Sequence, residues 1–89
     1  TDDAAAMGLA QYAAGAGEAL PRAMEIATQI AGNAPLSNYM MIQGIARIHD
    51  MGRSDGLFVE SLCAALAQTS PDAVEGLAAF LEKRSPRFR

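Results

Sequence analysis

The sequence predicts an all-α fold, a small bundle of about four helices within one region that spans residues 1–89. Two observations support this prediction. Apolar residues recur three and four positions apart in successive segments, which is the spacing of a helix that buries one face. Proline and serine stand at positions where helices begin, and glycine stands at positions where they end. No internal repeat and no low-complexity linker divides the chain.

A lead-in and turn is predicted for residues 1–17, ahead of the helices at residues 18–89. The lead-in begins with a short helix over residues 1–8, which Gly8 closes as a common C-terminal residue of helices. The first long helix runs from about Leu20 to Ala31, because apolar residues recur there with helical spacing. Its expected inner face consists of Leu20, Met24, Ala27 and Ala31, with Ile30 beside it.

Two longer helices follow, the first from Pro35 to about His49 and the next over about residues 56–68, with a turn at residues 50–55 between them. Gly44 lies in the middle of the first, where glycine costs ~1 kcal/mol relative to alanine, so we expect a closely packed neighbouring helix there. The expected buried positions are Met41, Ile45 and Ile48 with a second stripe of Tyr39, Ile42 and Ala46, and then Phe58, Leu62, Ala65 and Leu66.

The last predicted helix has a clear start. Ser70 is a good N-cap, and Pro71 suits the first helical position because its missing N–H would lack a partner there anyway. Asp72 and Glu75 then lie near the positive end of the helix. Its expected packing stripe is Val74, Leu77, Ala78 and Leu81.

Composition and charge limit what the chain does. The chain is 51% hydrophobic, but many of these residues are alanines, so we expect a marginal core that needs a partner surface. The formal net charge is −3 and is unevenly spread. Residues 1–82 hold ten acidic and three basic side chains, whereas residues 83–89 hold four basic ones. This balance argues against nucleic acid as a partner and leaves room for one compact anionic ligand.

Several kinds of site are excluded by residue type. Cys63 is the only cysteine, so the chain forms no internal disulfide, which indicates a reducing compartment, and we expect the cytoplasm. His49 is the only histidine, and no cysteine or histidine spacing suggests zinc, so we expect no metal site. No apolar run approaches the ~20 residues that span a bilayer, so we expect no membrane association.

The most informative stretch runs from Glu75 to Phe88. Phe80, Lys83 and Arg84 fall one turn apart, on a different face from the packing stripe. Such a set suits a ligand with a phosphate and a ring, because cations bind the phosphate and the ring stacks. Alternatively, the cations complement the dipole at the helix end. The residues alone favour this second interpretation.

The same stretch, EGLAAFLEKRSPRF, resembles the C-terminal motif E-G-x-x-A-F-x-E-K-R of the enoyl-CoA hydratase/isomerase (crotonase) superfamily. The segments from Met7 to Ser37 and from Gly56 to Gly76 are also similar to members of this family, in register. The resemblance implies that the chain is the C-terminal helical, trimerisation part of a crotonase-like fold that lacks its β/α spiral core. It also implies that the chain is a piece of a longer protein.

What the resemblance implies for function is an enzyme that acts on acyl-CoA thioesters, with hydration of 2-enoyl-CoA as the leading reaction. Coenzyme A would enter as part of the substrate, with no prosthetic group. The protein would be a homo-oligomer, a trimer or a dimer of trimers. No catalytic residue is expected within this chain, because the family's catalytic glutamates and oxyanion-binding N–H groups lie upstream. The chain alone would therefore be inactive.

By the same resemblance, Phe80 and Lys83 match positions that contact the nucleotide end of CoA in some members, and we add Arg84 as a neighbouring cation. Arg84 can equally form a salt bridge within the protein. Ile42 and Gln43 stand where many members have a lysine, and Cys63 stands near a position that is aromatic in some, which leaves the details of CoA contact open.

We interpret Glu60 as structural, and Glu75 as either favourable charge at the helix start or a contact with a neighbouring loop. The alternative to an acyl-CoA enzyme is a freestanding helical protein–protein interaction module without catalysis. In that case the apolar helix faces would associate and the basic end would only increase solubility.

Overall fold

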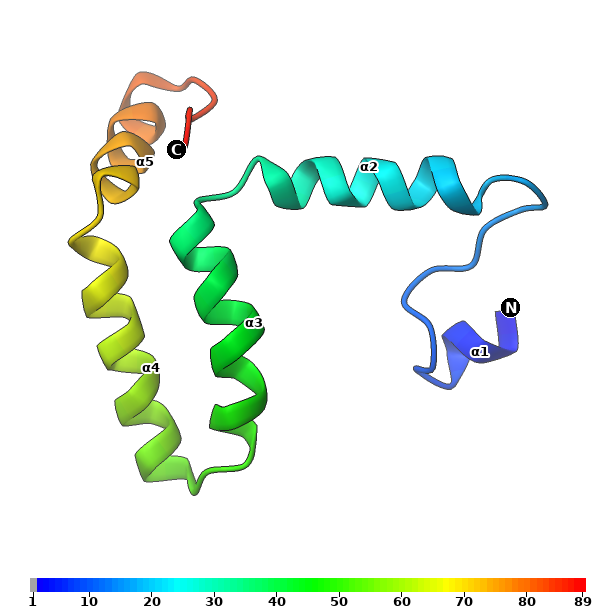
Figure 1. The fold of residues 1–89 in the computed structure, drawn as a ribbon, viewed down its shortest axis with the longest axis horizontal. Coiled ribbons are helices and arrows are strands. Elements are labelled where there is room, and N and C mark those ends of the chain that lie inside the picture. Colours follow the sequence, from blue (N-terminus) through cyan, green and yellow to red (C-terminus); the bar gives the residue numbers. More distant parts are fainter. Residues whose placement is uncertain (1) are drawn as a thin grey trace.

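The computed structural model describes residues 2–89, and the chain in this range is all-α with no strand (Figure 1). This confirms the predicted fold class. The helices are α1 (Asp2–Ala6), α2 (Ala19–Ala31), α3 (Pro35–His49), α4 (Arg53–Gln68) and α5 (Pro71–Glu82). None of them is long and apolar enough to cross a membrane.

Helix boundaries agree with local signals in the sequence, with one exception. The predicted short helix is present as α1, although Thr1 lies outside the described residues, and Gly8 after it has φ +78°. α2 and α3 match the predicted ranges to within one residue. α4 begins at Arg53, three residues before the predicted start at Gly56. The reason is that Gly52 is extended and serves as the N-cap, so Asp55 lies in the first turn, where the helix dipole favours it.

The arrangement of the helices is flat and open. The chain measures 44 × 38 × 18 Å and has a radius of gyration of 16.8 Å, whereas a compact domain of this length has about 12 Å. α3 and α4 lie antiparallel, α5 contacts the end of α4, and α2 extends away from them (Figure 1). The residues expected to form the inner face of α2 are therefore all exposed: Leu20, Met24, Ala27, Ile30 and Ala31.

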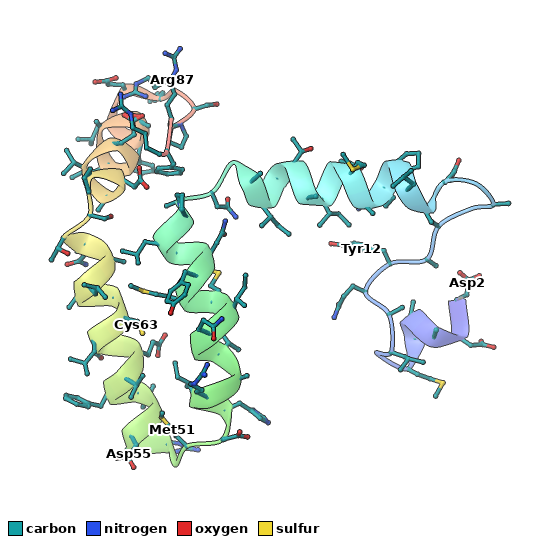
Figure 2. The ribbon with its side chains drawn as sticks, viewed as in Figure 1. Asp2, Tyr12, Met51, Asp55, Cys63 and Arg87 are labelled. Atoms are coloured by element: carbon teal, nitrogen blue, oxygen red, sulfur yellow. The ribbon has the colours of Figure 1, made fainter. Side chains whose placement is uncertain are left out.

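On α4, mainly small side chains face α3. The least exposed positions of α4 are Gly56, Val59, Cys63 and Ala67, and Figure 2 shows Cys63 on the side of α4 that faces α3. The larger residues predicted to be buried point elsewhere: Phe58, Leu62 and Leu66 are 66%, 53% and 56% exposed. On α3 the less exposed face consists of Ser37, Met40, Gly44 and Ile48, so Met41, Ile45, Tyr39 and Ile42 of the predicted stripes are exposed.

Close approach of the two helices occurs at Gly56 and not at Gly44. A Cβ atom added to Gly56 would lie 3.2 Å from Ile48 Cγ2 and 3.4 Å from the Ile48 carbonyl oxygen. A Cβ atom added to Gly44 would meet nothing within 4 Å among the described residues. The prediction of a tightly packed neighbour at Gly44 is therefore wrong within this part of the chain. α3 and α4 approach each other closely beside the turn that joins them, at Gly56.

α5 buries a different face from the one predicted. Val74, Leu77 and Leu81 are exposed, whereas Ala79 is 1% exposed. Ala79 is the only buried apolar side chain within residues 2–89. The last residues of the chain fold back toward α5, so the helix is covered on the face that carries Glu75 and Gly76. This return of the chain forms the candidate site.

Candidate functional site

Ser70 fixes where α5 begins, as the sequence predicts. Its side-chain oxygen accepts a hydrogen bond from the Ala73 N–H at 3.3 Å and donates one to the Ala67 carbonyl at 2.7 Å. Pro71 follows at the first helical position. The hydroxyl thus links the end of α4 to the start of α5. It places the carboxylates of Asp72 and Glu75 in the first turns of the helix.

Lys83 reverses the chain at the other end of α5. It adopts a left-handed conformation, with φ 55° and ψ 44°. The Arg84 N–H donates to the Ala79 carbonyl at 3.0 Å, and the Lys83 N–H donates to the Phe80 carbonyl at 3.3 Å. This is the bonding pattern of a Schellman C-cap, in which glycine usually occupies the left-handed position. A residue with a Cβ atom pays roughly 1–2 kcal/mol there, so neighbouring contacts must hold it.

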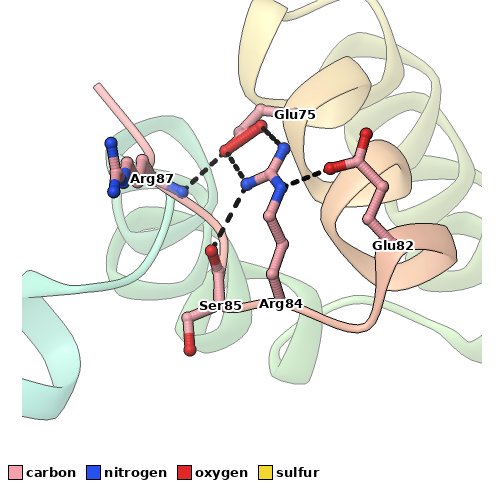
Figure 3. Close-up of polar contacts among 5 residues, drawn as sticks. All are labelled: Glu75, Glu82, Arg84, Ser85 and Arg87. Carbon is pink, nitrogen blue, oxygen red and sulfur yellow. Dashed lines mark hydrogen bonds and ion pairs between the residues drawn. The ribbon is translucent and has the colours of Figure 1, made fainter.

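Glu75 supplies the main contacts of the reversed segment (Figure 3). Its two carboxylate oxygens accept from Nη2 and Nη1 of Arg84 at 2.7 and 3.0 Å, and Oε2 also accepts from the Arg87 N–H at 2.8 Å. Arg84 Nε donates to Glu82 at 2.6 Å. Bidentate arginine–carboxylate pairs are the stronger class of ion pair because two parallel bonds fix the geometry.

Asp72 and Phe88 extend this contact along the helix. The Arg89 N–H donates to Asp72 Oδ1 at 2.9 Å. The Phe88 ring lies against Gly76, since a Cβ atom added there would be 3.5 Å from a ring carbon. We call this set of contacts the C-terminal clasp; it consists of Asp72, Glu75, Gly76, Arg84, Arg87, Phe88 and Arg89.

The clasp is charged at neutral pH. Hydrogen bonds from Arg84, and then from the Arg87 N–H, lower the pKa of Glu75 from 4.5 to about 2. The same pair raises the pKa of Arg84 above its already high usual value. The side chains remain partly open to water, with Arg84 39% and Glu75 23% exposed. Salt therefore screens the pair in part.

The three residues proposed from the sequence for CoA contact have different surroundings. Phe80 is 79% exposed on α5. Lys83 is exposed, and its ammonium forms no hydrogen bond or ion pair with residues 2–89. Arg84, in contrast, donates through Nε, Nη1 and Nη2 to Glu75, Glu82 and the Ser85 carbonyl. Whether any of them contacts CoA stays a prediction.

The structure bears on three further features of the sequence. Glu75 contacts the segment that follows its own helix, which agrees with the second of its two interpretations. Within the described residues, no cluster of three or more histidine, cysteine, aspartate or glutamate side chains is arranged to hold a metal ion. The cation–π contact in this part of the chain is formed by Arg22 over Tyr12 at 4.8 Å, and not by Phe80 with its neighbouring cations.

Sequence reasoning missed the clasp residues Asp72, Arg87 and Phe88. Two signals were present: the carboxylates of Asp72 and Glu75 lie three residues apart on one helix face, and Pro86 with Phe88 follows the helix end. Neither signal predicts a contact by itself. The clasp depends on the reversal at Lys83, which the residue type does not indicate.

Comparison with known proteins shows similarity over nearly the whole chain. The chain is 37% identical to a protein assigned as an enoyl-CoA hydratase in Thermus thermophilus, with 97% of the chain and 34% of that protein covered. It is 32% identical to the enoyl-CoA hydratase EchA19 of Mycobacterium tuberculosis, with 98% and 33% covered. The chain thus spans about a third of the length of these relatives. No family model matches the chain.

Solved structures agree with the sequence relatives. A protein assigned as an enoyl-CoA hydratase/isomerase in Mycobacterium abscessus superposes with a TM-score of 0.91 at 36% identity, covering 100% of this chain and 37% of that one. An enoyl-CoA hydratase/isomerase from Mycobacterium paratuberculosis gives 0.90 at 27% identity, covering 99% and 35%. The chain is therefore similar, over nearly its whole length, to the C-terminal helical part of enoyl-CoA hydratase/isomerase superfamily proteins.

Proposed function

We propose that this chain is the C-terminal helical part of an enzyme that acts on acyl-CoA thioesters, with hydration of 2-enoyl-CoA as the reaction. The observation that carries the proposal is the match to enoyl-CoA hydratases along 97–98% of the chain. Coenzyme A enters as part of the substrate, without a prosthetic group. The chain contributes to assembly and to the CoA site and is inactive alone. The assay that tests the reaction is hydration of 2-enoyl-CoA by the full-length protein.

The proposed CoA contacts are Phe80 and Lys83, at the nucleotide end. Their exposure supports this role, because an exposed ring and an unengaged ammonium are free to stack on adenine and to pair with phosphate. Arg84 is the weaker candidate for direct contact, because its guanidinium already donates to two carboxylates.

Replacing Lys83 tests this assignment. In the full-length protein, we expect Lys83→Ala to raise KM several-fold and to leave kcat nearly unchanged. An exposed lysine–phosphate contact contributes less than the roughly 1.5–3 kcal/mol of a well-formed charge-assisted bond, and it lies remote from the reacting atoms. Lys83→Gly is the matched variant, since glycine removes the same charge and also accepts the left-handed backbone. Equal KM changes in both variants would assign the effect to the charge. A collapse of kcat would contradict the role.

We further propose that the protein is a homo-oligomer, a trimer or a dimer of trimers. The support is the row of large apolar side chains on α4, Phe58, Leu62 and Leu66, which is more than half exposed. Exposed apolar patches of this kind mark interaction sites. We expect Leu62→Asp to lower the sedimentation coefficient of the full-length protein while leaving its far-ultraviolet circular dichroism intact. Unchanged sedimentation of that variant would place the interface elsewhere.

We place the protein in the cytoplasm, a reducing compartment that suits the free thiol of Cys63, the single cysteine of this chain. A relative from Bos taurus is named a mitochondrial protein, so fractionation of cells is the direct test. The acidic net charge of −3 supports the absence of nucleic acid among its partners. An interaction module without catalysis would show the same assembly but no hydration of 2-enoyl-CoA.

A further inference from the structure

Two adjacent cations at the end of α5, Lys83 and Arg84, have opposite environments. Arg84 is held by Glu75 and Glu82 through Nε, Nη1 and Nη2. Lys83, one residue earlier, makes no such side-chain contact with residues 2–89. An arginine that bound phosphate in this arrangement would have to give up its bidentate carboxylate. The geometry therefore separates two roles that the sequence assigned together.

What Arg84 holds is the backbone around Lys83. The Glu75–Arg84 pair closes the chain from the first turns of α5 to the residue after the C-cap, so Lys83 lies inside the closed segment. The Arg84 N–H also donates to Ala79, so the same residue anchors the reversal by its backbone and by its side chain. Without the ion pair, a helix end with a strained left-handed lysine would open more readily.

We propose that Arg84 is a positioning residue, whose ion pair with Glu75 holds the left-handed Lys83 in place so that the Lys83 ammonium is presented to the phosphate of CoA. This inference rests on the proposed CoA contact of Lys83. The physical gain is preorganisation: a side chain already held in its binding conformation loses less freedom when the ligand binds. Arg84 itself then carries no phosphate contact.

The direction in which Glu75→Gln changes CoA affinity distinguishes a positioning role of Arg84 from direct phosphate binding. If Arg84 acts through Glu75, Glu75→Gln weakens CoA binding as Arg84→Gln does, by about two- to fivefold each. The double variant is then no weaker than either single one, because both remove the same contact. If Arg84 instead binds phosphate directly, Glu75→Gln frees the guanidinium and removes a negative charge, so CoA binding stays equal or becomes tighter.

The measurement is titration calorimetry of the full-length protein with coenzyme A, alongside KM and kcat for the acyl-CoA substrate. Arg84→Lys keeps the charge and loses the fork geometry, so we expect intermediate weakening for positioning. Glu18→Gln makes the same chemical change ahead of α2 and should leave affinity unchanged. Gly56→Val crowds Ile48 where α3 and α4 meet, away from α5, and controls for loss of stability, so it should lower the melting temperature without reproducing the change in affinity.

Trypsin cleavage after Arg84 reports on the clasp without any ligand. We expect Glu75→Gln to accelerate this cleavage several-fold, because the peptide bond between Arg84 and Ser85 is released from α5.

If Lys83→Ala leaves CoA affinity unchanged, the proposed function of Lys83 fails. If Lys83→Ala weakens binding while Glu75→Gln leaves it equal or tightens it, the positioning role of Arg84 fails and the CoA contact of Lys83 stands.

Discussion

The α3–α4 hairpin and the C-terminal clasp are both closed by contacts between segments near in sequence, but the contacts differ in kind. In the hairpin, small residues such as Gly56 and Ala67 bring two helices together. In the clasp, carboxylates of α5 accept hydrogen bonds from the returning chain. The first depends on shape and apolar contact, which salt and pH change little. The clasp depends on charge, because salt screens its ion pair and acid protonates Glu75.

This difference in contacts explains which side chains of each region remain exposed. The hairpin uses its small side chains internally, so its larger ones, including Leu62 and Leu66, remain exposed. In the clasp, Glu75 and Arg84 are paired with each other, while Phe80 and Lys83 beside them are exposed. The hairpin is thus left with an exposed apolar face, and the end of α5 with an exposed ring and an exposed cation.

The largest effect is expected from filling the closest approach of the hairpin. Gly56→Val should lower the free energy of unfolding of the full-length protein by about 1–3 kcal/mol, because the added side chain overlaps Ile48, which lies only 3.2 Å from a Cβ atom at this position. Chemical denaturation followed by circular dichroism measures this change. A neutral Gly56→Val variant would mean that α3 and α4 do not approach closely at this end.

Gly44→Ala is the matched control on the other helix of the hairpin. A Cβ atom meets nothing within 4 Å there, so alanine should raise the free energy of unfolding by about 0.5–1 kcal/mol through its helix propensity. A loss of stability in the full-length protein would reveal a surface that covers Gly44 and is not part of residues 2–89. The pair of variants therefore tests both which helix ends are in contact and which face of α3 is covered.

The smallest effect is expected from acid, and it should appear in the clasp alone. Folding lowers the pKa of Glu75 from 4.5 to about 2, so its ionised form is favoured by the folded state. The stability contributed by the pair is fully present above pH 4.5 and is lost as the pH falls toward 2. The melting temperatures of the native protein and of Glu75→Gln should converge over this range. A difference that persists unchanged at pH 2 would contradict this cause.

Most helix positions could be predicted from the sequence because their signals are local. Ser70 with Pro71 marks the start of α5, and Gly32 follows α2 directly. α4 begins three residues before its predicted start because Arg53 and Ser54 carry no strong helix signal. The sequence groups Arg84 with Lys83, whereas the structure pairs Arg84 with Glu75 and Glu82. A charge pattern shows which cations are near one another and not which carboxylate each one meets.

Buried faces were predicted less well, for a physical reason. An apolar stripe such as Phe58, Leu62 and Leu66 marks a face that avoids water, but it does not say which surface covers it. α3 packs against the narrower side of α4, where Gly56, Cys63 and Ala67 leave room for it. Small residues carry a weak hydrophobic signal, so periodicity ranks them below the larger ones that remain exposed.

By itself, the sequence determined the all-α class, the positions of the helices and the family resemblance, because these depend on residue types at fixed local spacings. Only the tertiary structure decided which helix faces are covered and which cation is engaged. Both depend on where the chain turns, and the decisive turn is the left-handed backbone at Lys83. Lysine rarely adopts that conformation, and it is held by Glu75 and Arg84, nine residues apart, whose contact exists only once the chain has folded back.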